Sequence, residues 1–164
     1  MSVRHNILIA VDDSGATDRA VTYVASIIGR YRHFRVHLFH VAPILPKLLE
    51  FGGSENIQEE DKREAEITAA RIRYLEDLAQ AVFAKAQSIL QHAGLPVGAV
   101  KTHVVSTISG EDVIGNLLEA AQTNTCDTIV VGRQSHSWLR ELVQHHLADE
   151  LIRKAAGFTI WVVE

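Results

Sequence analysis

Residues 127–146 read D-T-I-V-V-G-R-Q-S-H-S-W-L-R-E-L-V-Q-H-H. The stretch begins as a short apolar strand, Thr128 to Val131, and turns at Gly132, where a nucleotide-binding α/β protein would begin its phosphate loop. A loop that holds phosphate needs small residues, because backbone N–H groups must come close to the anion. Here a tryptophan, two leucines and three histidines follow the glycine. The position of Gly132 is therefore that of a phosphate loop, but the residues after it are too bulky for the backbone to approach a phosphate closely.

Outward from this stretch, short apolar runs alternate with segments of helical periodicity. The predicted strands are residues 6–12, 35–41, 100–105, 128–132 and 158–163. The predicted helices are residues 17–28, 58–92, 111–122 and 142–155. This alternation predicts an α/β fold: an open, parallel, five-stranded sheet with right-handed crossovers and two helices on each face.

The length of 164 residues favours a single domain, residues 1–164. The periodic pattern lapses over residues 42–58, which contain two prolines and a Gly-Gly pair, so we expect an irregular insertion before the long helix. The N-terminal sequence has no long apolar run of the kind that would predict a signal or membrane segment. We therefore expect a cytoplasmic protein without a membrane partner.

The net charge of −4 gives no reason to expect nucleic-acid binding. A single cysteine, Cys126, excludes an intramolecular disulfide and a cysteine-based zinc cluster. Because Cys126 precedes an apolar strand, we expect it to act as a small buried hydrophobic residue.

Asp12, Asp13 and Ser14 follow the first predicted strand. Paired acidic residues there are typical of receiver domains, but those also need an aspartate after strand three and a lysine after strand five. The corresponding positions read Val105-Ser106-Thr107 and Val163-Glu164. The adjacent glycines of an ATP pyrophosphatase loop are absent as well. The simplest role is that Ser14, Thr17 or Asp18 caps the first helix.

Nine histidines raise the question of a metal site. His37 and His40 are an odd number of residues apart on a strand and should face opposite sides of the sheet. His145 and His146, with His136 nearby, would point about 100° apart if the segment is helical. Zinc needs three or four converging ligands, so we predict no metal site.

Several segments together resemble the universal stress protein family. They are the opening I-L-I-A-V-D-D-S, the L-F-H-V-A end of strand two, the long central helix, C-D-T-I-V-V-G-R, and the closing I-R-K-A-A-G-F-T-I-W-V-V. The resemblance spans the whole chain and implies the Rossmann-like universal stress protein fold, with strand order 3-2-1-4-5.

ATP-binding members of that family carry G-x-x-G, nine residues, then G-[S/T]. These positions correspond here to Gly132, Ser135, His145 and His146, and only the first keeps the family residue. The resemblance would place an adenine near Val41, a ribose near Asp12 and phosphates near Gly132 and Ser135. Arg133 or Arg140 could supply positive charge. A ring at His145 occupies space that the backbone needs around phosphate. ATP binding in the usual manner is therefore not expected.

No catalytic constellation is legible, so the leading hypothesis is a non-catalytic stress-response module without a cofactor, acting in regulation or interaction. The alternative is a divergent adenine-nucleotide binder with at most slow hydrolysis. A helical 132–146 segment would favour the first, and an open cleft between Asp12, Val41 and Gly132 the second. The apolar strand 158–163 is expected at a sheet edge, where pairing with a second copy would give a homodimer. Protein partners beyond that are not predicted.

Overall fold

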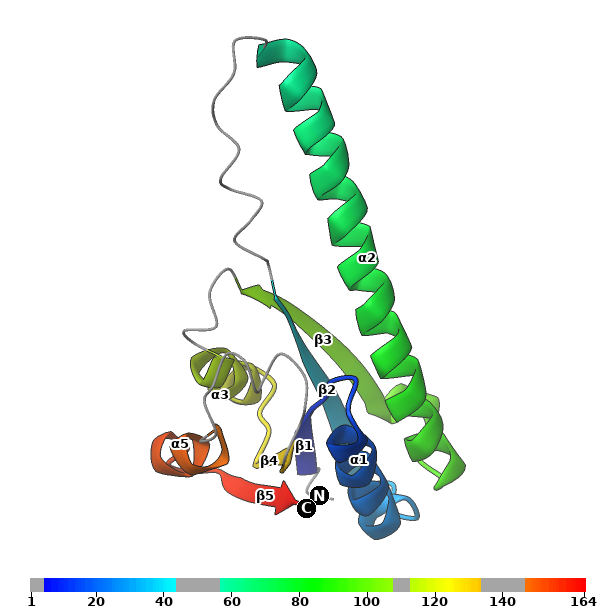
Figure 1. Cartoon of the computed structure of the whole chain (residues 1–164). Helices are drawn as coiled ribbons and strands as arrows, with labels where there is room; N and C mark the ends of the chain where they lie inside the picture. The colour runs from blue at the N-terminus through cyan, green and yellow to red at the C-terminus, as the bar shows by residue number, and fades with distance from the viewer. Residues whose placement is uncertain (1–4, 44–56, 108–112, 134–146) are drawn as a thin grey trace.

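The computed structural model describes residues 5–43, 57–107, 113–133 and 147–164. Its strands form one five-stranded sheet in the order β3-β2-β1-β4-β5, and all neighbouring strands are parallel (Figure 1). The strands are β1 (His5–Ala10), β2 (Phe34–Pro43), β3 (Val100–Thr107), β4 (Thr128–Gly132) and β5 (Thr159–Val163). The predicted strand order and orientation are confirmed.

Helices cover both faces of this sheet, as predicted. The helices α1 (Gly15–Ile28) and α2 (Ile57–His92) lie on one face, and α3 (Val113–Thr123) and α5 (Leu147–Lys154) lie on the other (Figure 1). A short 3₁₀ helix, η2 (Val97–Ala99), leads into β3. The sheet is thus the middle of three layers.

Two apolar clusters, one on each face, hold these layers together. In β1, Ile7 and Ile9 pack toward α1 and α2, whereas Leu8 packs toward α3 and α5. All three are at most 1% exposed. A central parallel strand is buried on both faces, which explains its nearly continuous apolar sequence.

The boundaries of several elements differ from those predicted. Helix α1 begins at Gly15, two residues earlier than expected, because Ser14 caps it: the Ser14 side chain accepts a hydrogen bond from the Thr17 N–H. Strand β2 continues to Pro43, because its pairing with β3 extends as far as Pro43 and Thr107. Helix α2 begins at Ile57. Of the irregular insertion predicted for 42–58, residues 42–43 belong to β2 and residues 57–58 to α2, while residues 44–56 lie outside the described residues.

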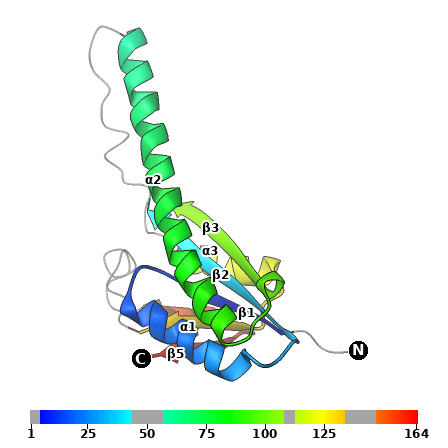
Figure 2. The same cartoon turned by 90° about the vertical axis from the view of Figure 1, so that its right-hand side faces the viewer.

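Helix α2 is 36 residues long. Among its side chains that the structure describes, the buried ones lie in the C-terminal half: Ala79, Val82, Phe83, Ala86 and Leu90. The N-terminal half extends well beyond the sheet in both views (Figures 1 and 2). None of the helices in the described part of the chain combines the length and apolar character that a bilayer crossing requires.

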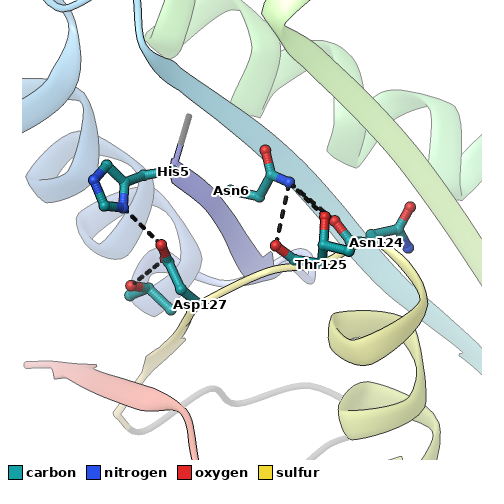
Figure 3. A network of polar contacts seen from close by, with 6 residues as sticks. His5, Asn6, Asn124, Thr125 and Asp127 are labelled. Carbon is teal, nitrogen blue, oxygen red and sulfur yellow. Dashed lines mark hydrogen bonds and ion pairs between the residues drawn. The ribbon is translucent and has the colours of Figure 1, made fainter. Parts of the chain in front are cut away.

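A polar network joins β1 to the α3–β4 connection at the amino end of the sheet (Figure 3). The Asn6 side-chain amide donates to the carbonyl oxygens of Asn124 and Thr125, at 3.0 and 3.2 Å, and to the Thr125 hydroxyl at 3.0 Å. Thr125 has a positive φ of 50°, which a non-glycine residue rarely adopts. His5 Nδ1 lies 2.7 Å from the Asp127 carboxylate. The network holds this turn at the end opposite the candidate site.

Candidate functional site

Asp12 lies just beyond β1, and it is only 3% exposed. The Thr17 hydroxyl donates to Asp12 Oδ1 at 2.6 Å and accepts from the Asp12 backbone N–H at 2.9 Å. The Ser14 hydroxyl also donates to Asp12 Oδ1. Since Ser14 caps α1 as well, the carboxylate is fixed by the same hydroxyls that begin the helix. Helix capping and the hydrogen bonds to Asp12 are thus sufficient to explain Asp12, Ser14 and Thr17 in the D-D-S-G-A-T sequence.

A cavity of about 350 Å³ separates this turn from α2. One wall comes from the β1–α1 turn, the start of α1 and the end of β2, and the other from α2. The lining residues are Asp12, Asp13, Thr17, Asp18 and His40 on the first wall, and Leu75, Leu78, Ala81, Val82, Lys85 and Ala86 on the second. Its volume is near the lower end for small-molecule pockets.

The cavity is acidic. Three of its lining residues are aspartates, and the lining cation, Lys85, donates to Asp18 Oδ2 at 2.6 Å. This hydrogen bond raises the pKa of Lys85. His40 Nδ1 lies 2.8 Å from the Val11 carbonyl oxygen. Because a carbonyl only accepts, Nδ1 carries the proton and donates. The arrangement suits a neutral or cationic group better than a phosphate.

Gly132 does not line this cavity. A Cβ at this position would lie 2.7 Å from the Ala16 carbonyl oxygen and 3.0 Å from the Ala16 Cβ. The glycine therefore lets the end of β4 approach the first turn of α1. Packing alone is sufficient to explain a residue that the sequence associates with phosphate.

Arg133 follows β4 and contacts the end of β5 and the residue after it. Its backbone N–H donates to the Val163 carbonyl at 2.6 Å, and its guanidinium pairs with the Glu164 carboxylate. Both side chains are more than half exposed. Arg133 therefore extends the β4–β5 pairing and is not among the residues that line the cavity.

Val41 is 2% exposed and belongs to the apolar cluster on the α3 and α5 face. Asp12, Val41 and Gly132 thus stand near the carboxyl ends of neighbouring strands, as predicted, but of the three only Asp12 lines the cavity. Ser135, His145 and His146 lie outside the described residues, as do His136 and the proposed helical extension over 132–146 beyond Arg133.

The histidines of β2 face opposite sides, as predicted. His40 stacks edge-to-face on Phe83 of α2, with ring centroids 6.1 Å apart. His37 lies on the other face, where its Nδ1 is 3.0 Å from Nε2 of His103 in β3. Burial, then His103, Lys101 and Arg35, lower the pKa of His37 to about 4. Among the described residues, no three His, Cys, Asp or Glu side chains are grouped so as to hold a metal.

Sequence reasoning missed His40 and Lys85 as parts of the site. His40 was considered only as a metal ligand, although its position next to Val41 at the end of a strand was a usable signal. Lys85 lies 67 residues from Asp18 in the sequence, and only the packing of α2 on α1 brings the two together.

The fold has clear relatives among solved structures. A protein of the universal stress protein family from Burkholderia pseudomallei is 18% identical, with a TM-score of 0.65 over 99% of this chain and 98% of that one. A universal stress protein from Archaeoglobus fulgidus, solved in complex with dAMP, is 19% identical, with a TM-score of 0.54 over 99% of both chains. At such identities the likeness shows a common fold.

A family protein from Arabidopsis thaliana, solved with AMP bound, is 12% identical, with a TM-score of 0.59 over 97% of this chain and 90% of that one. None of the curated proteins compared with the chain matches it. The model of the universal stress protein family matches residues 4–162. Because that match covers nearly the full length, the chain belongs to the universal stress protein family.

Proposed function

We propose that this chain is a non-catalytic regulatory or interaction module of the stress response, which does not hold ATP in the manner usual for its family. The charge of the cavity beside Asp12 carries this proposal. Asp13 and Asp18 add two further carboxylates, and Lys85 is already paired with Asp18. A triphosphate would bring more negative charge into a site that is itself negative.

Calorimetric titration with adenosine, AMP and ATP tests this proposal. We expect no ATP binding tighter than about 100 μM, or roughly −5.5 kcal/mol. Affinity should fall from adenosine to ATP as phosphates are added. Asp13→Asn should weaken this discrimination, whereas Glu119→Gln on α3, on the other face of the sheet, should leave it unchanged. An ATP dissociation constant in the low micromolar range would refute the proposal.

The alternative is a divergent adenine-nucleotide binder with at most slow hydrolysis. It is favoured by the dAMP and AMP complexes of proteins with the same fold. The apolar wall formed by Leu75, Leu78 and Val82 also suits a flat base. In this case AMP should bind more tightly than adenosine in the same titration, because the phosphate would contribute to affinity.

We propose further that the module is a homodimer formed through β5. Among the described strands, β5 pairs only with β4, so its outer edge has no neighbour there. Thr159 is exposed, and Val162 is 36% exposed. A long apolar edge is usually covered in nature, and a two-fold copy of the same strand would cover it.

The mass in solution tests this assembly. Light scattering should give at least twice the chain mass of 18.1 kDa. Charged replacements at Thr159 and Trp161 would also disturb this edge, but the Trp161 ring makes an edge-to-face contact with Tyr23, with centroids 6.1 Å apart, and packs against the core. Val162→Lys is therefore the cleaner variant. It should weaken this interface, and unchanged pairing through β5 in that variant would contradict the proposal.

A further inference from the structure

The projecting half of α2 presents an exposed face that no described element covers. Ile67 is 60% exposed and Tyr74 is 62% exposed, and both belong to the N-terminal half of α2. That half extends beyond the sheet (Figures 1 and 2). At 100° per residue, Ala70 lies between them on the same side of the helix. Exposed apolar side chains that share one side of a helix are a feature of surfaces that bind a partner.

This face lies on the side of α2 opposite the residues that pack on the sheet. The residues of α2 that pack on the sheet, such as Ala79, Phe83 and Ala86, recur on one side of the helix. Counted at 100° per residue, Ala70 lies nearly opposite that side. A second helix could therefore lie along residues 63–77, a length of about 21 Å, without meeting its own sheet.

The charges on this face complement each other when the helix is turned end over end. With a two-fold axis beside Ala70, residue i lies near the residues of the second copy numbered from about 139 − i to 141 − i, and the flank of the helix on which it lies decides between them. Glu66 then faces Arg73 of the second copy, and Arg63 faces Asp77. All four side chains are exposed. No ion pair joins any of them to another residue in the described part of the chain.

The apolar residues follow the same register. Ile67 would lie opposite Tyr74 of the second copy on one flank, while the Glu66–Arg73 pairs occupy the other flank. Ala70 at the centre has a side chain small enough for two helices to approach closely. Each contact occurs twice, as a two-fold interface requires.

We propose that the N-terminal half of α2 pairs antiparallel with the same segment of a second copy, about a two-fold axis beside Ala70. This interface is separate from the β5 edge. If both form, two different two-fold contacts join each chain to two neighbours and build an assembly larger than a dimer.

A charge swap in a β5 variant tests the pairing by itself. In the Val162→Lys background, the chain should still dimerise at about 100 μM, a concentration suited to a small and weak interface. Adding Glu66→Lys places like charges together twice and should weaken the dimer about tenfold or more. Adding Arg73→Glu to that variant should restore it. Analytical ultracentrifugation measures all three.

The matched control is Glu76→Lys, an exposed residue on the same helix that lies about 120° from the proposed face. It should leave the dimer intact. A Val162→Lys variant that is monomeric, a Glu66→Lys variant with unchanged mass, or a swap that fails to restore pairing would each overturn the proposal. The wild-type chain can still pair through β5. A lower mass of the Val162→Lys variant relative to the wild type therefore measures the β5 interface and not the α2 interface.

Covalent capture gives an independent check. Ala70→Cys should form a disulfide between copies under mild oxidation, because the axis places residue 70 opposite itself. Glu76→Cys should not. Cys126 does not interfere, since it is buried. Equal crosslinking of the two variants would contradict the register.

Discussion

Gly132 at the end of β4 lies against the backbone of Ala16 in the first turn of α1, where a Cβ would come within 2.7 Å of the Ala16 carbonyl oxygen. Only glycine permits this approach without a shift of the helix. The contact fixes α1, and with it Ser14 and Thr17, relative to the carboxyl edge of the sheet.

Gly132→Ala should therefore destabilise the fold by about 1–3 kcal/mol, the usual cost of overpacking. The control is Gly98→Ala, where an added Cβ meets nothing within 4 Å. Denaturant unfolding should show a change within roughly 0.5 kcal/mol for the control. Equal stability of both variants would mean that α1 can shift at Ala16 to make room for the added Cβ without a cost in stability.

The Thr17 hydroxyl should contribute substantially to the stability of the fold, because it makes two hydrogen bonds with Asp12. It donates to the carboxylate and accepts from the backbone N–H. Thr17→Val leaves that buried N–H without its acceptor, and should cost about 1–3 kcal/mol in free energy of unfolding. Thr17→Ser keeps the hydroxyl and should cost less. If valine were the better tolerated of the two, packing rather than hydrogen bonding would govern the turn.

At the opposite end of the sheet, Asn6→Ala should lower stability by about 1–2 kcal/mol, because the carbonyl oxygens of Asn124 and Thr125 lose a shared donor. Asn6→Asp should be at least as harmful, since a carboxylate cannot donate to them. Thermal unfolding at neutral pH compares the two. A stable Asp variant would show that the amide donors are dispensable.

The strands and the parallel sheet could be predicted because each strand's apolar pattern reflects its burial, as the continuous run of Ile7, Leu8 and Ile9 shows. The strand order followed from the resemblance to the universal stress protein family. The site was harder to predict, because only the packing of α2 on α1 brings Lys85 to Asp18. Contacts between strands depend on register in the same way. His37 meets His103 only because β2 and β3 pair with Phe39 opposite His103. Gly132 has two interpretations: a glycine after a strand suits a phosphate or the close approach of a helix, and the sequence does not distinguish them.

Cys126 should behave as a buried residue and not as a reactive thiol. Burial, and then Asp127, raise the pKa of its thiol to about 11. With roughly two pKa units between this value and that of a free cysteine, the thiolate fraction at neutral pH falls about 100-fold. Ellman's reagent should therefore react at least that much more slowly with the native chain than with chain unfolded in concentrated guanidinium chloride. Comparable rates would show that the thiol is accessible.

The His37–His103 pair should make stability depend on pH in the mildly acidic range. His37 is 3% exposed, and its pKa is lowered to about 4, chiefly by burial and then by His103. The pKa of His103 is lowered too, by burial and by Lys101. The unfolded chain therefore binds protons at a higher pH than the folded one, and stability falls as pH drops from about 6.5 toward about 4.

For His37 the full loss corresponds to roughly 3 kcal/mol. Carboxylates also titrate in the lower part of this window, so the informative quantity is the difference between the wild type and His37→Gln, which retains a side chain able to hydrogen-bond with His103. Urea unfolding at several pH values should show a shallower decline for the variant between pH values of about 6.5 and 4. Parallel curves would mean that His37 takes up its proton without opening the pair, and that β2 and β3 accommodate the charge.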